Sequence, residues 1–353
     1  MKSISEDCRI LIVKLSSIGD VLHSTVIAHN LKLHYPHCHI TWLVSPPASV
    51  LVEGNPYVDK VIVWDRRAFD EAMCNANLFK AFKSLQEASK LLAESHFDVT
   101  IDIQSLLLTG ILSWLSNAPR RIGIHERHEG NSFFMTEMAD DTNEQHKIFR
   151  YMAALRQLGI VDCFPGLILN LPSSLDTFAE DFWKSHNINV NKPILFIHMR
   201  TSWESKNWSP QHYNEVLNLI NSDVQIVFSG SKDDSSYIEQ ACISLNKKIL
   251  SIAGEVNLLE LAALFKTATL LLTSDTGPLH IAEAVGLKTL SLWGPTSPEM
   301  YGPLTQGHSF IITPNECRFC CKTKCKYKHN DCMDSINPKL VAKKIDELIR
   351  GRD

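Results

Sequence analysis

The sequence lacks both a long hydrophobic run and an excess of charge of one sign. Of its 353 residues, 35 are Lys or Arg and 39 are Asp or Glu, so the formal net charge is −4. This balance gives no whole-molecule attraction to nucleic acid or anionic lipid, and an anionic partner must be bound by a local patch. No apolar run approaches the roughly 18 to 20 residues that cross a bilayer, and the first residues do not resemble a signal peptide. We therefore expect a cytoplasmic protein.

Three ligand-binding signatures are also missing. No two glycines are spaced as G-x-G, and no G-x-x-x-x-G-K-[ST] sequence occurs, which excludes a dinucleotide oxidoreductase and a P-loop NTPase. No D-x-D pair occurs, so a carboxylate pair that holds a metal–diphosphate complex is not evident. A bound phosphate would have to be met by helix N-termini and basic side chains.

Short apolar runs alternate with helical stretches along the chain. Hydrophobic residues make up 44% and charged residues 21%, as in ordinary globular proteins, and the length suits about two domains. Alternating β and α units predict an α/β protein with a mostly parallel sheet. The predicted strands are residues 9–15, 39–44, 60–64, 98–103, 194–198, 225–230, 249–254, 269–275 and 289–294, with helices such as 21–34 and 78–94 between them.

The strand and helix pattern restarts after the polar stretch SHNINVNKP. We therefore predict two Rossmann-like β/α/β domains, at residues 1–175 and 190–336, followed by a helix at 337–353 that Asn337 caps. Ligands of open α/β sheets bind beyond the carboxyl ends of the strands. We expect the two domains to face each other across a ligand-binding crevice.

The first candidate site is the loop at residues 16–20, SSIGD, between a strand and a helix. Gly19 lets the backbone approach a ligand closely, and Ser17 is a candidate substrate contact. Asp20 could act as a general base that takes a proton from an acceptor hydroxyl. The alternative is that Asp20 only stabilises the first turn of the helix.

The second candidate site is the segment SDTGPLH, in which a strand runs into a helix. Free N–H groups near Asp275, Thr276 and Gly277 would suit a diphosphate, and His280 could bind a phosphate or ribose. The alternative is a well-capped structural helix.

Two further candidates stand outside that segment. Lys206, in the polar stretch after residues 194–198, could place one compact charge on a phosphate, or could simply be solvated. Thr296 lies in a turn fixed by Gly294, Pro295 and Pro298, and is a candidate substrate contact.

Five of the ten cysteines fall within sixteen residues near the end of the sequence. Four of them have the spacing C-x2-C-x4-C-x6-C, which lets four thiols converge tetrahedrally, and an all-sulfur set suits Zn²⁺ or iron. We predict that these four form a structural knuckle that anchors the closing helix. The alternative is that they are unligated, and Cys321 is a further possible ligand. The predicted ligands are Cys317, Cys320, Cys325 and Cys332.

Four segments of the sequence, taken together, resemble the motifs of one known enzyme family. They are KLSSIGDVLHSTVIAHNLKLHYP, FDVTIDIQ with RRIGI, SDTGPLHIAEAVGLKTLSLWGPTSPEMYGP, and the closing C-x2-C-x4-C-x6-C-M run. In this order and at this separation they resemble the ADP-heptose:lipopolysaccharide heptosyltransferases of glycosyltransferase family 9. The resemblance covers nearly the whole chain.

The resemblance implies a two-domain GT-B fold that binds the acceptor in the amino domain and the nucleotide-sugar in the carboxyl domain. It implies an inverting, metal-independent transfer of heptose from ADP-heptose to a lipopolysaccharide core acceptor. Asp20 falls on the family's catalytic base, and Lys206 falls near its phosphate-contacting Lys. The donor-binding loop falls on Asp275, Thr276, Gly277 and His280. One departure is Ser105, where relatives often carry Gly after D-x-Q.

The resemblance also implies no cofactor for catalysis and an anionic, lipid-linked core oligosaccharide as acceptor. Peripheral contact with the inner face of the cytoplasmic membrane would follow. One alternative is a family member that uses another nucleotide-sugar or acceptor, and another is a GT-B-fold sugar-nucleotide epimerase. A third reading, the cysteine run as a metal-held nucleic-acid module, is disfavoured because the chain has no basic excess.

Overall fold

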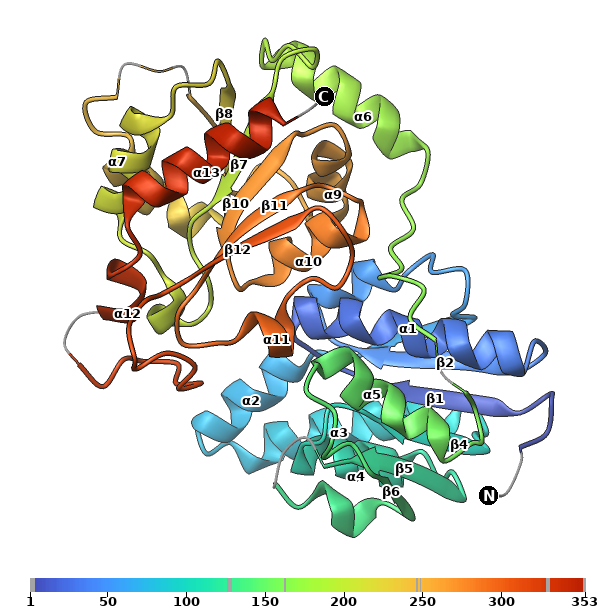
Figure 1. The fold of residues 1–353 in the computed structure, drawn as a ribbon. Coiled ribbons are helices and arrows are strands. Elements are labelled where there is room, and N and C mark those ends of the chain that lie inside the picture. Colours follow the sequence, from blue (N-terminus) through green and yellow to red (C-terminus); the bar gives the residue numbers. More distant parts are fainter. Residues whose placement is uncertain are drawn as a thin grey trace. The chain divides into compact units, whose positions relative to one another are not determined.

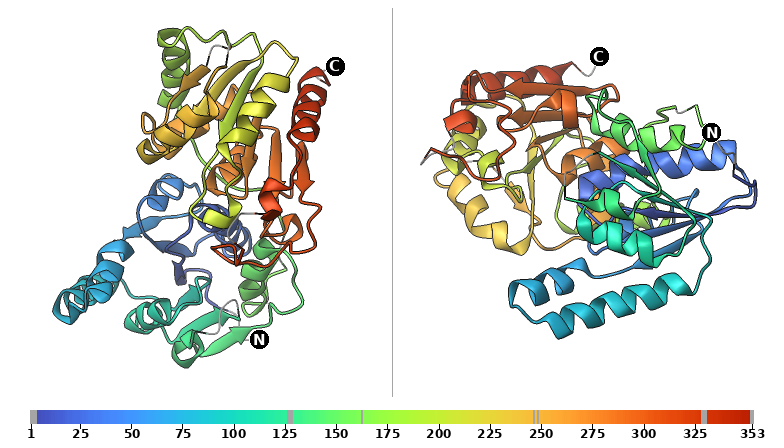
Figure 2. Two further views of the ribbon diagram at one scale, coloured as in Figure 1. Left: turned by 90° about the vertical axis from the view of Figure 1, so that its left-hand side faces the viewer. Right: turned by 90° about the horizontal axis from the view of Figure 1, so that it is seen from below.

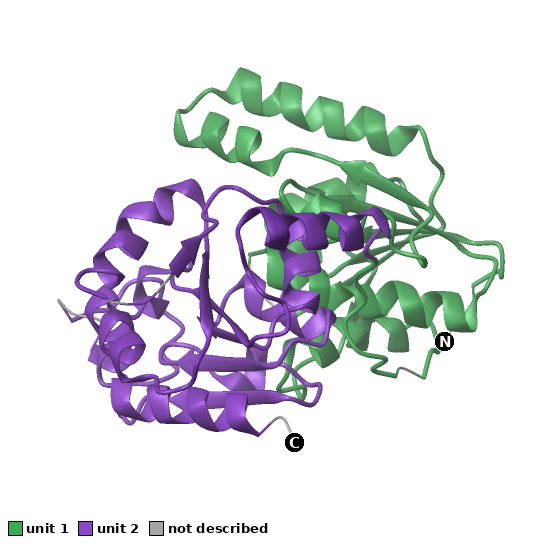
Figure 3. Cartoon of the chain, turned by 90° about the horizontal axis from the view of Figure 1, so that it is seen from above, with its two compact units in different colours: residues 1–170 green, residues 171–353 purple. Residues whose placement is uncertain are grey.

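The computed structural model describes residues 4–125, 129–161, 163–245, 247, 249–327 and 331–351 (Figure 1). The chain divides into two compact units, residues 1–170 and residues 171–353 (Figure 3). Each unit contains one six-stranded sheet whose neighbouring strands all run parallel, with helices packed against it (Figure 2). The fold is therefore α/β, as the sequence predicts.

The first unit follows the predicted alternation of strands and helices. Its strands are β1 (Arg9–Val13), β2 (His39–Val44), β3 (Lys60–Val63), β4 (Val99–Asp102), β5 (Arg120–Ile124) and β6 (Glu137–Ala139). Its helices are α1 (Ile18–His34), α2 (Arg66–Cys74), α3 (Leu78–Ala93), α4 (Leu107–Leu115) and α5 (Lys147–Arg156), with short 3-10 helices η1 (Ala48–Leu51) and η2 (Asn131–Phe134).

The second unit repeats this alternation. Its strands are β7 (Ile194–His198), β8 (Gln225–Ser229), β9 (Ile249–Ser251), β10 (Leu270–Ser274), β11 (Thr289–Trp293) and β12 (His308–Ile312). Its α-helices are α6 (Ser174–Ser185), α7 (Pro210–Leu219), α8 (Ser235–Ala241), α9 (Leu258–Lys266), α10 (Gly277–Ala284), α11 (Pro298–Tyr301), α12 (Asp331–Asp334) and α13 (Pro338–Arg350). The 3-10 helices are η3 (Glu204–Lys206) and η4 (Lys232–Asp234).

The two sheets have the same strand order. The first sheet is ordered β3-β2-β1-β4-β5-β6, and the second, read from its other edge, is ordered β9-β8-β7-β10-β11-β12. In sheets of this kind, ligands bind beyond the carboxyl ends of the two strands at which the order reverses. Those strands are β1 and β4 in the first unit, and β7 and β10 in the second.

The central strands are apolar along nearly their whole length because helices cover both of their faces. In β1, Ile10, Leu11, Ile12 and Val13 are completely buried. The edge strand β12 is different, since only Ile311 of its five residues is buried. None of the described helices is both long and apolar enough to cross a membrane.

The boundary between the units lies at residues 170 and 171, whereas the sequence suggested that the first domain ends at 175 and the second begins near 190. The difference arises because α6 packs within the second unit. The Trp183 indole N–H donates a 2.8 Å hydrogen bond to the Thr267 hydroxyl, and the Trp183 ring contacts Phe196. The helix predicted at 337–353 is also part of the second unit, because Val341 and Ile345 of α13 are buried in its core.

Candidate active site

Asp20 is held in the first turn of α1 by contacts to both of its carboxylate oxygens. Oδ2 accepts hydrogen bonds from the Ser17 hydroxyl at 2.9 Å and from the Ser17 backbone N–H at 3.3 Å. Oδ1 accepts a hydrogen bond from the Tyr151 hydroxyl at 2.7 Å. The sequence suggested that Gly19 and Asp20 lie in a loop before the helix. In the structure the helix begins at Ile18, so both residues belong to its first turn.

Lys14 is buried next to this carboxylate and reaches it through Tyr151 of α5. The Lys14 ammonium donates hydrogen bonds to the Tyr151 hydroxyl oxygen at 3.1 Å and to the Ile103 carbonyl at 3.3 Å. Burial alone raises the pKa of Asp20, but the charge of Lys14 and the hydrogen bond from Tyr151 outweigh it, so the pKa lies well below its ordinary value. Asp20 is therefore an ionised carboxylate at neutral pH.

The segment after β4 supports the backbone between β1 and α1. The Gln104 side-chain oxygen accepts hydrogen bonds from the N–H groups of Leu15 and Ser16, at 3.1 and 3.0 Å. Ser105 has a φ of +61°, in the left-handed region that glycine enters without steric cost. Its hydroxyl donates a 2.7 Å hydrogen bond to the Ile124 carbonyl. A side chain is thus accommodated at a position whose backbone suits glycine.

Asp275 is the centre of the candidate site in the second unit. Its Oδ2 accepts hydrogen bonds from Lys206 Nζ and from the Thr296 hydroxyl, both at 2.7 Å. Asp275 directly follows β10, Lys206 lies beyond β7, and Thr296 lies beyond β11, so three neighbouring strands bring three side chains together. The Asp275 and Lys206 side chains are 8% and 13% exposed. Charges so far removed from water require a partner.

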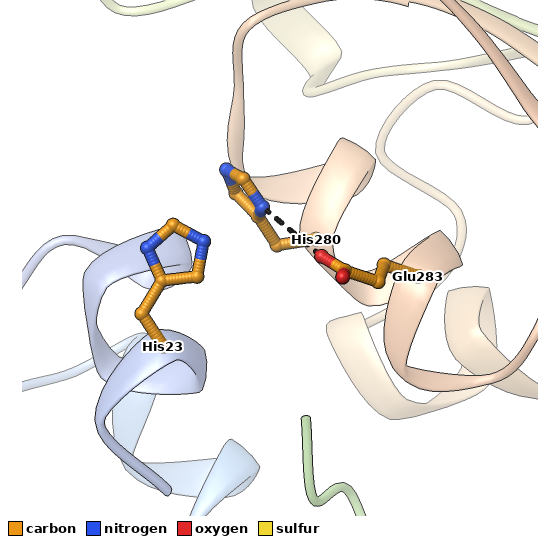
Figure 4. A group of neighbouring side chains, drawn as sticks. All are labelled: His23, His280 and Glu283. Atoms are coloured by element: carbon orange, nitrogen blue, oxygen red, sulfur yellow. Dashed lines mark ion pairs between the residues drawn. The ribbon is translucent and has the colours of Figure 1, made fainter. Parts of the chain in front are cut away.

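His280 lies one turn into α10 and is also buried near Asp275. Its Nε2 is 4.0 Å from Asp275 Oδ1, and its Nδ1 is 3.8 Å from Glu283 Oε2 on the same helix (Figure 4). Glu283 accepts hydrogen bonds from the N–H groups of Leu304 and Thr305. Burial raises the pKa of Glu283, but His280 and these N–H groups outweigh it and lower that pKa. An ionised Glu283 therefore orients His280.

Two backbone N–H groups at the start of α10 are free to bind a ligand. Within the described residues, no hydrogen bond is made by the N–H of Thr276 or of Gly277. Thr276 is the N-cap residue, but its side chain makes no capping hydrogen bond. Unpaired N–H groups at the positive end of a helix dipole attract anions. The contacts do not support the alternative in which Thr276 serves only as a cap.

The four predicted thiol ligands line one cavity of about 360 Å³ in the second unit. Cys321, the further possible ligand, does not line it. In the described part of the chain, no three of the sulfur atoms lie within 4.8 Å of one another. A tetrahedral zinc site with Zn–S bonds of about 2.3 Å requires sulfur atoms about 3.8 Å apart. The thiols share a cavity, and binding of a metal would require their sulfur atoms to move closer together.

Comparison with known proteins places this arrangement in a family. The profile of glycosyltransferase family 9 (heptosyltransferase) matches residues 86–330. The chain belongs to glycosyltransferase family 9. This family 9 chain is 26% identical over 297 residues to the lipopolysaccharide core heptosyltransferase OpsX of Haemophilus influenzae, across 83% of the chain and 80% of that protein. It is a glycosyltransferase, and the alternative of an epimerase is not favoured.

Solved structures of family 9 enzymes share the fold. A family 9 glycosyltransferase from Veillonella parvula superposes with a TM-score of 0.82 at 24% identity, covering 99% of both chains. The Escherichia coli ADP-heptose heptosyltransferase II superposes with a TM-score of 0.76 at 19% identity, covering 97% of this chain and 98% of the other. The predicted GT-B fold is thereby confirmed for this family 9 member.

The family 9 site contains residues that the sequence did not single out. Tyr151 lies in a helix with no motif, so no local signal marks it. One feature of the sequence could have pointed to Lys14, because it is a charged residue directly after a buried strand. Glu283 lies three residues beyond His280 on the same helix, a spacing at which side chains meet.

Proposed function

We propose that this enzyme transfers heptose from ADP-heptose to a lipopolysaccharide core acceptor, with inversion and without a catalytic metal. The observation that carries the proposal is the convergence of Lys206 and Thr296 on Asp275, beside the free N–H groups of Thr276 and Gly277. Such a site offers one cation and two N–H donors to a diphosphate. The choice of heptose as the sugar and of lipopolysaccharide as the acceptor rests on the names of the similar heptosyltransferases.

In the proposed reaction, the acceptor hydroxyl oxygen attacks the anomeric carbon of the donor. A new C–O bond forms as the bond from that carbon to the diphosphate breaks, and ADP leaves with the electron pair. The proton of the hydroxyl passes to the carboxylate of Asp20. Negative charge that grows on the diphosphate is stabilised by Lys206 and by the N–H groups near Gly277.

The low pKa of Asp20 fits a late proton transfer. A carboxylate with a depressed pKa is a weak base for a free hydroxyl. The hydroxyl becomes far more acidic once its oxygen has begun to bond to carbon, and a weak base then suffices. Tyr151 and Ser17, which donate hydrogen bonds to Asp20, hold the carboxylate in one orientation.

The direct test is incubation with a panel of ADP- and UDP-sugars, with and without a lipid-linked core acceptor. We expect ADP release from ADP-heptose that depends on the acceptor. Acceptor-dependent release of UDP from a UDP-sugar would show that the donor is this UDP-sugar and not ADP-heptose. Release of a free sugar epimer without an acceptor would overturn the transferase in favour of the epimerase.

We also propose that Cys317, Cys320, Cys325 and Cys332 bind Zn²⁺ or iron in a structural site. Their shared cavity and their all-sulfur chemistry support the proposal. A distant solved structure of the same fold, TibC of enterotoxigenic E. coli, is described as iron-containing, at a TM-score of 0.61 and 12% identity.

Elemental analysis of reduced, tag-free protein tests the metal site. We expect near-unit occupancy, retained in Cys321→Ser and lost in Cys325→Ser. A zinc plus iron content below about a tenth of an equivalent in the unmodified protein would remove the proposal.

We further propose that the enzyme works in the cytoplasm and contacts the inner face of the membrane through the α2–α3 hairpin. Figures 2 and 3 show these helices side by side and extending from the sheet of the first unit. Three apolar side chains at the start of α3 are mostly exposed: Leu78 by 68%, Phe79 by 80% and Phe82 by 59%.

Charge supports an anionic membrane as the partner of this hairpin. Lys80 and Lys83 lie among the three apolar side chains, and no acidic residue occurs between Glu71 and Glu87. Phe79 and Lys83 are four residues apart and share one face of the helix. Exposed aromatic and basic side chains on one helix are typical of segments that lie in a membrane interface.

Vesicle sedimentation tests the membrane contact. We expect binding to vesicles that contain phosphatidylglycerol, and a loss of at least about tenfold in Phe79→Glu, because one buried Phe contributes about 1.5–3 kcal/mol. Ile243→Glu is the matched control, since Ile243 is a 64% exposed apolar residue of the other unit. Equal binding by both variants would show that the hairpin is not the contact.

A further inference from the structure

The cysteine segment, residues 317–325, is hydrogen-bonded to the turn that carries Thr296. The Phe319 N–H donates to the Gly294 carbonyl at 2.9 Å, and the Cys321 N–H donates to the Pro295 carbonyl at 2.8 Å. Phe319 and Cys321 have φ values of +61° and +52°, which side-chain-bearing residues rarely adopt. Such conformations persist only where the surroundings hold them. The segment is therefore fixed against the turn.

The same segment is bonded to the loop that carries Lys206. Ser205, the residue before Lys206, donates its backbone N–H to the Thr323 carbonyl at 3.1 Å. Its hydroxyl donates to the Lys322 carbonyl at 2.5 Å. Ser205 is 2% exposed, so these bonds are shielded from water. The segment thus connects the loop that follows β7 with the turn that follows β11.

The fourth thiol contacts this turn directly. A Cβ atom added to Gly294 would lie 3.0 Å from the Cys332 sulfur and 2.7 Å from the Met333 sulfur. Gly294 has no Cβ, and this lets α12, which carries Cys332, approach the backbone of the turn. Both the cysteine segment and Cys332 therefore contact the residues just before Thr296.

We propose that the cysteine segment positions Lys206 and Thr296 on Asp275, so that metal ligation by the four thiols raises the affinity for the donor diphosphate. This inference rests on the proposed function, because it takes the site around Asp275 as the donor site. A ligated segment holds Ser205 and Pro295 in place. A released segment lets Lys206 and Thr296 adopt more orientations, and ordering them again on binding weakens affinity. The thiols then affect donor binding as well as stability.

The first test removes one bond of the segment without changing a thiol. Ser205→Ala deletes only the hydroxyl bond to Lys322. We expect the dissociation constant for ADP and the KM for the donor to rise about threefold to tenfold, while the KM for the acceptor stays constant. Ser185→Ala is the matched control, because it deletes a 2.8 Å hydroxyl–carbonyl bond on α6 of the same unit. We expect unchanged ADP binding in the control.

The second test uses the full-length wild-type protein stripped of metal under reducing conditions and then reloaded with Zn²⁺. We expect calorimetry to show ADP binding that weakens at least about fivefold on stripping and recovers on reloading. Equal ADP affinity in stripped protein, reloaded protein and Ser205→Ala would overturn the positioning role and leave the donor site intact. Failure of the reloaded wild type to bind ADP at all would instead overturn the proposed function, and this inference with it.

Discussion

Tyr151 donates a 2.7 Å hydrogen bond to Asp20 across 131 positions of the sequence. The same hydroxyl oxygen accepts a hydrogen bond from the buried ammonium of Lys14. One phenol therefore links a buried cation to the proposed general base. This link sets both the orientation and the protonation of the carboxylate.

Asp20→Asn should remove most transfer activity. Loss of a general base typically costs about a hundredfold to ten-thousandfold in rate. The affinity for ADP should stay nearly intact, because the candidate donor residues belong to the second unit. Steady-state kinetics and calorimetry on the same preparation check both statements. Turnover at the wild-type rate would show that Asp20 only stabilises the start of α1.

Tyr151→Phe should shift the acidic limb of the pH–rate profile toward higher pH. The substitution removes a hydrogen bond that lowers the pKa of Asp20, so that pKa rises toward its ordinary value of about 3.9. Asp20 must be ionised to accept a proton, and activity therefore begins to fall at a higher pH in the variant. Profiles of kcat/KM for both proteins measure the shift, and superimposable acidic limbs would contradict it.

The depressed pKa of Asp20 also links stability to pH. A carboxyl group whose pKa is lower in the folded state contributes stability that is fully present above the ordinary pKa. That contribution is lost as the pH falls through the folded value. The difference in melting temperature between the wild type and Asp20→Asn should therefore stay constant from pH 7 to about 4 and begin to shrink only below that pH.

His280→Ala and Thr276→Ala should both weaken ADP binding. His280 lies beside Asp275, and Thr276 is a cap residue without a capping bond, so its hydroxyl is available to a ligand. We expect a melting temperature close to wild type for Thr276→Ala, because no capping bond is lost. Unchanged ADP affinity with a sharply lower melting temperature would favour a structural role.

Asp346→Ala should destabilise the second unit. The Asp346 carboxylate accepts hydrogen bonds from the N–H and hydroxyl of Ser222 and from the N–H of Asn221, and so ties α13 to the segment between α7 and β8. Leaving such donors unpaired costs about 1–3 kcal/mol, which thermal unfolding detects. Lys343→Ala is the control, because Lys343 is a 76% exposed residue of the same helix. An equal effect of both substitutions would contradict the role of Asp346.

Strand positions could be predicted wherever an apolar run had clear ends. The strands predicted at 39–44 and 194–198 coincide with β2 and β7 at both ends. The strands β5, β6 and β12 were not predicted. In these short segments charged or polar residues stand beside the apolar ones, such as Arg120 and Arg121 in β5 and His308 and Ser309 in β12, and the apolar signal is then too weak to read.

The site in the second unit was easier to foresee than that in the first. Lys206, Asp275 and Thr296 each follow a strand, and the carboxyl ends of parallel strands meet at one edge of a sheet. Their pairing still required the strand order, which a single sequence does not contain. Tyr151 could not be foreseen, because its partner is brought to it only by the packing of α5 on α1.

The place of α13 in the second core determines when each unit can fold during synthesis. The strands of the first sheet and helix α5 are complete by residue 156, and at about 5 to 20 residues per second the ribosome still needs about 10 to 40 seconds to reach the end of α13. The first unit can fold within that time. The second unit cannot, because Val341, Ile345 and Ile349 are part of its core. A chain that stops before residue 338 would therefore carry a folded first unit and expose the apolar surface that α13 covers.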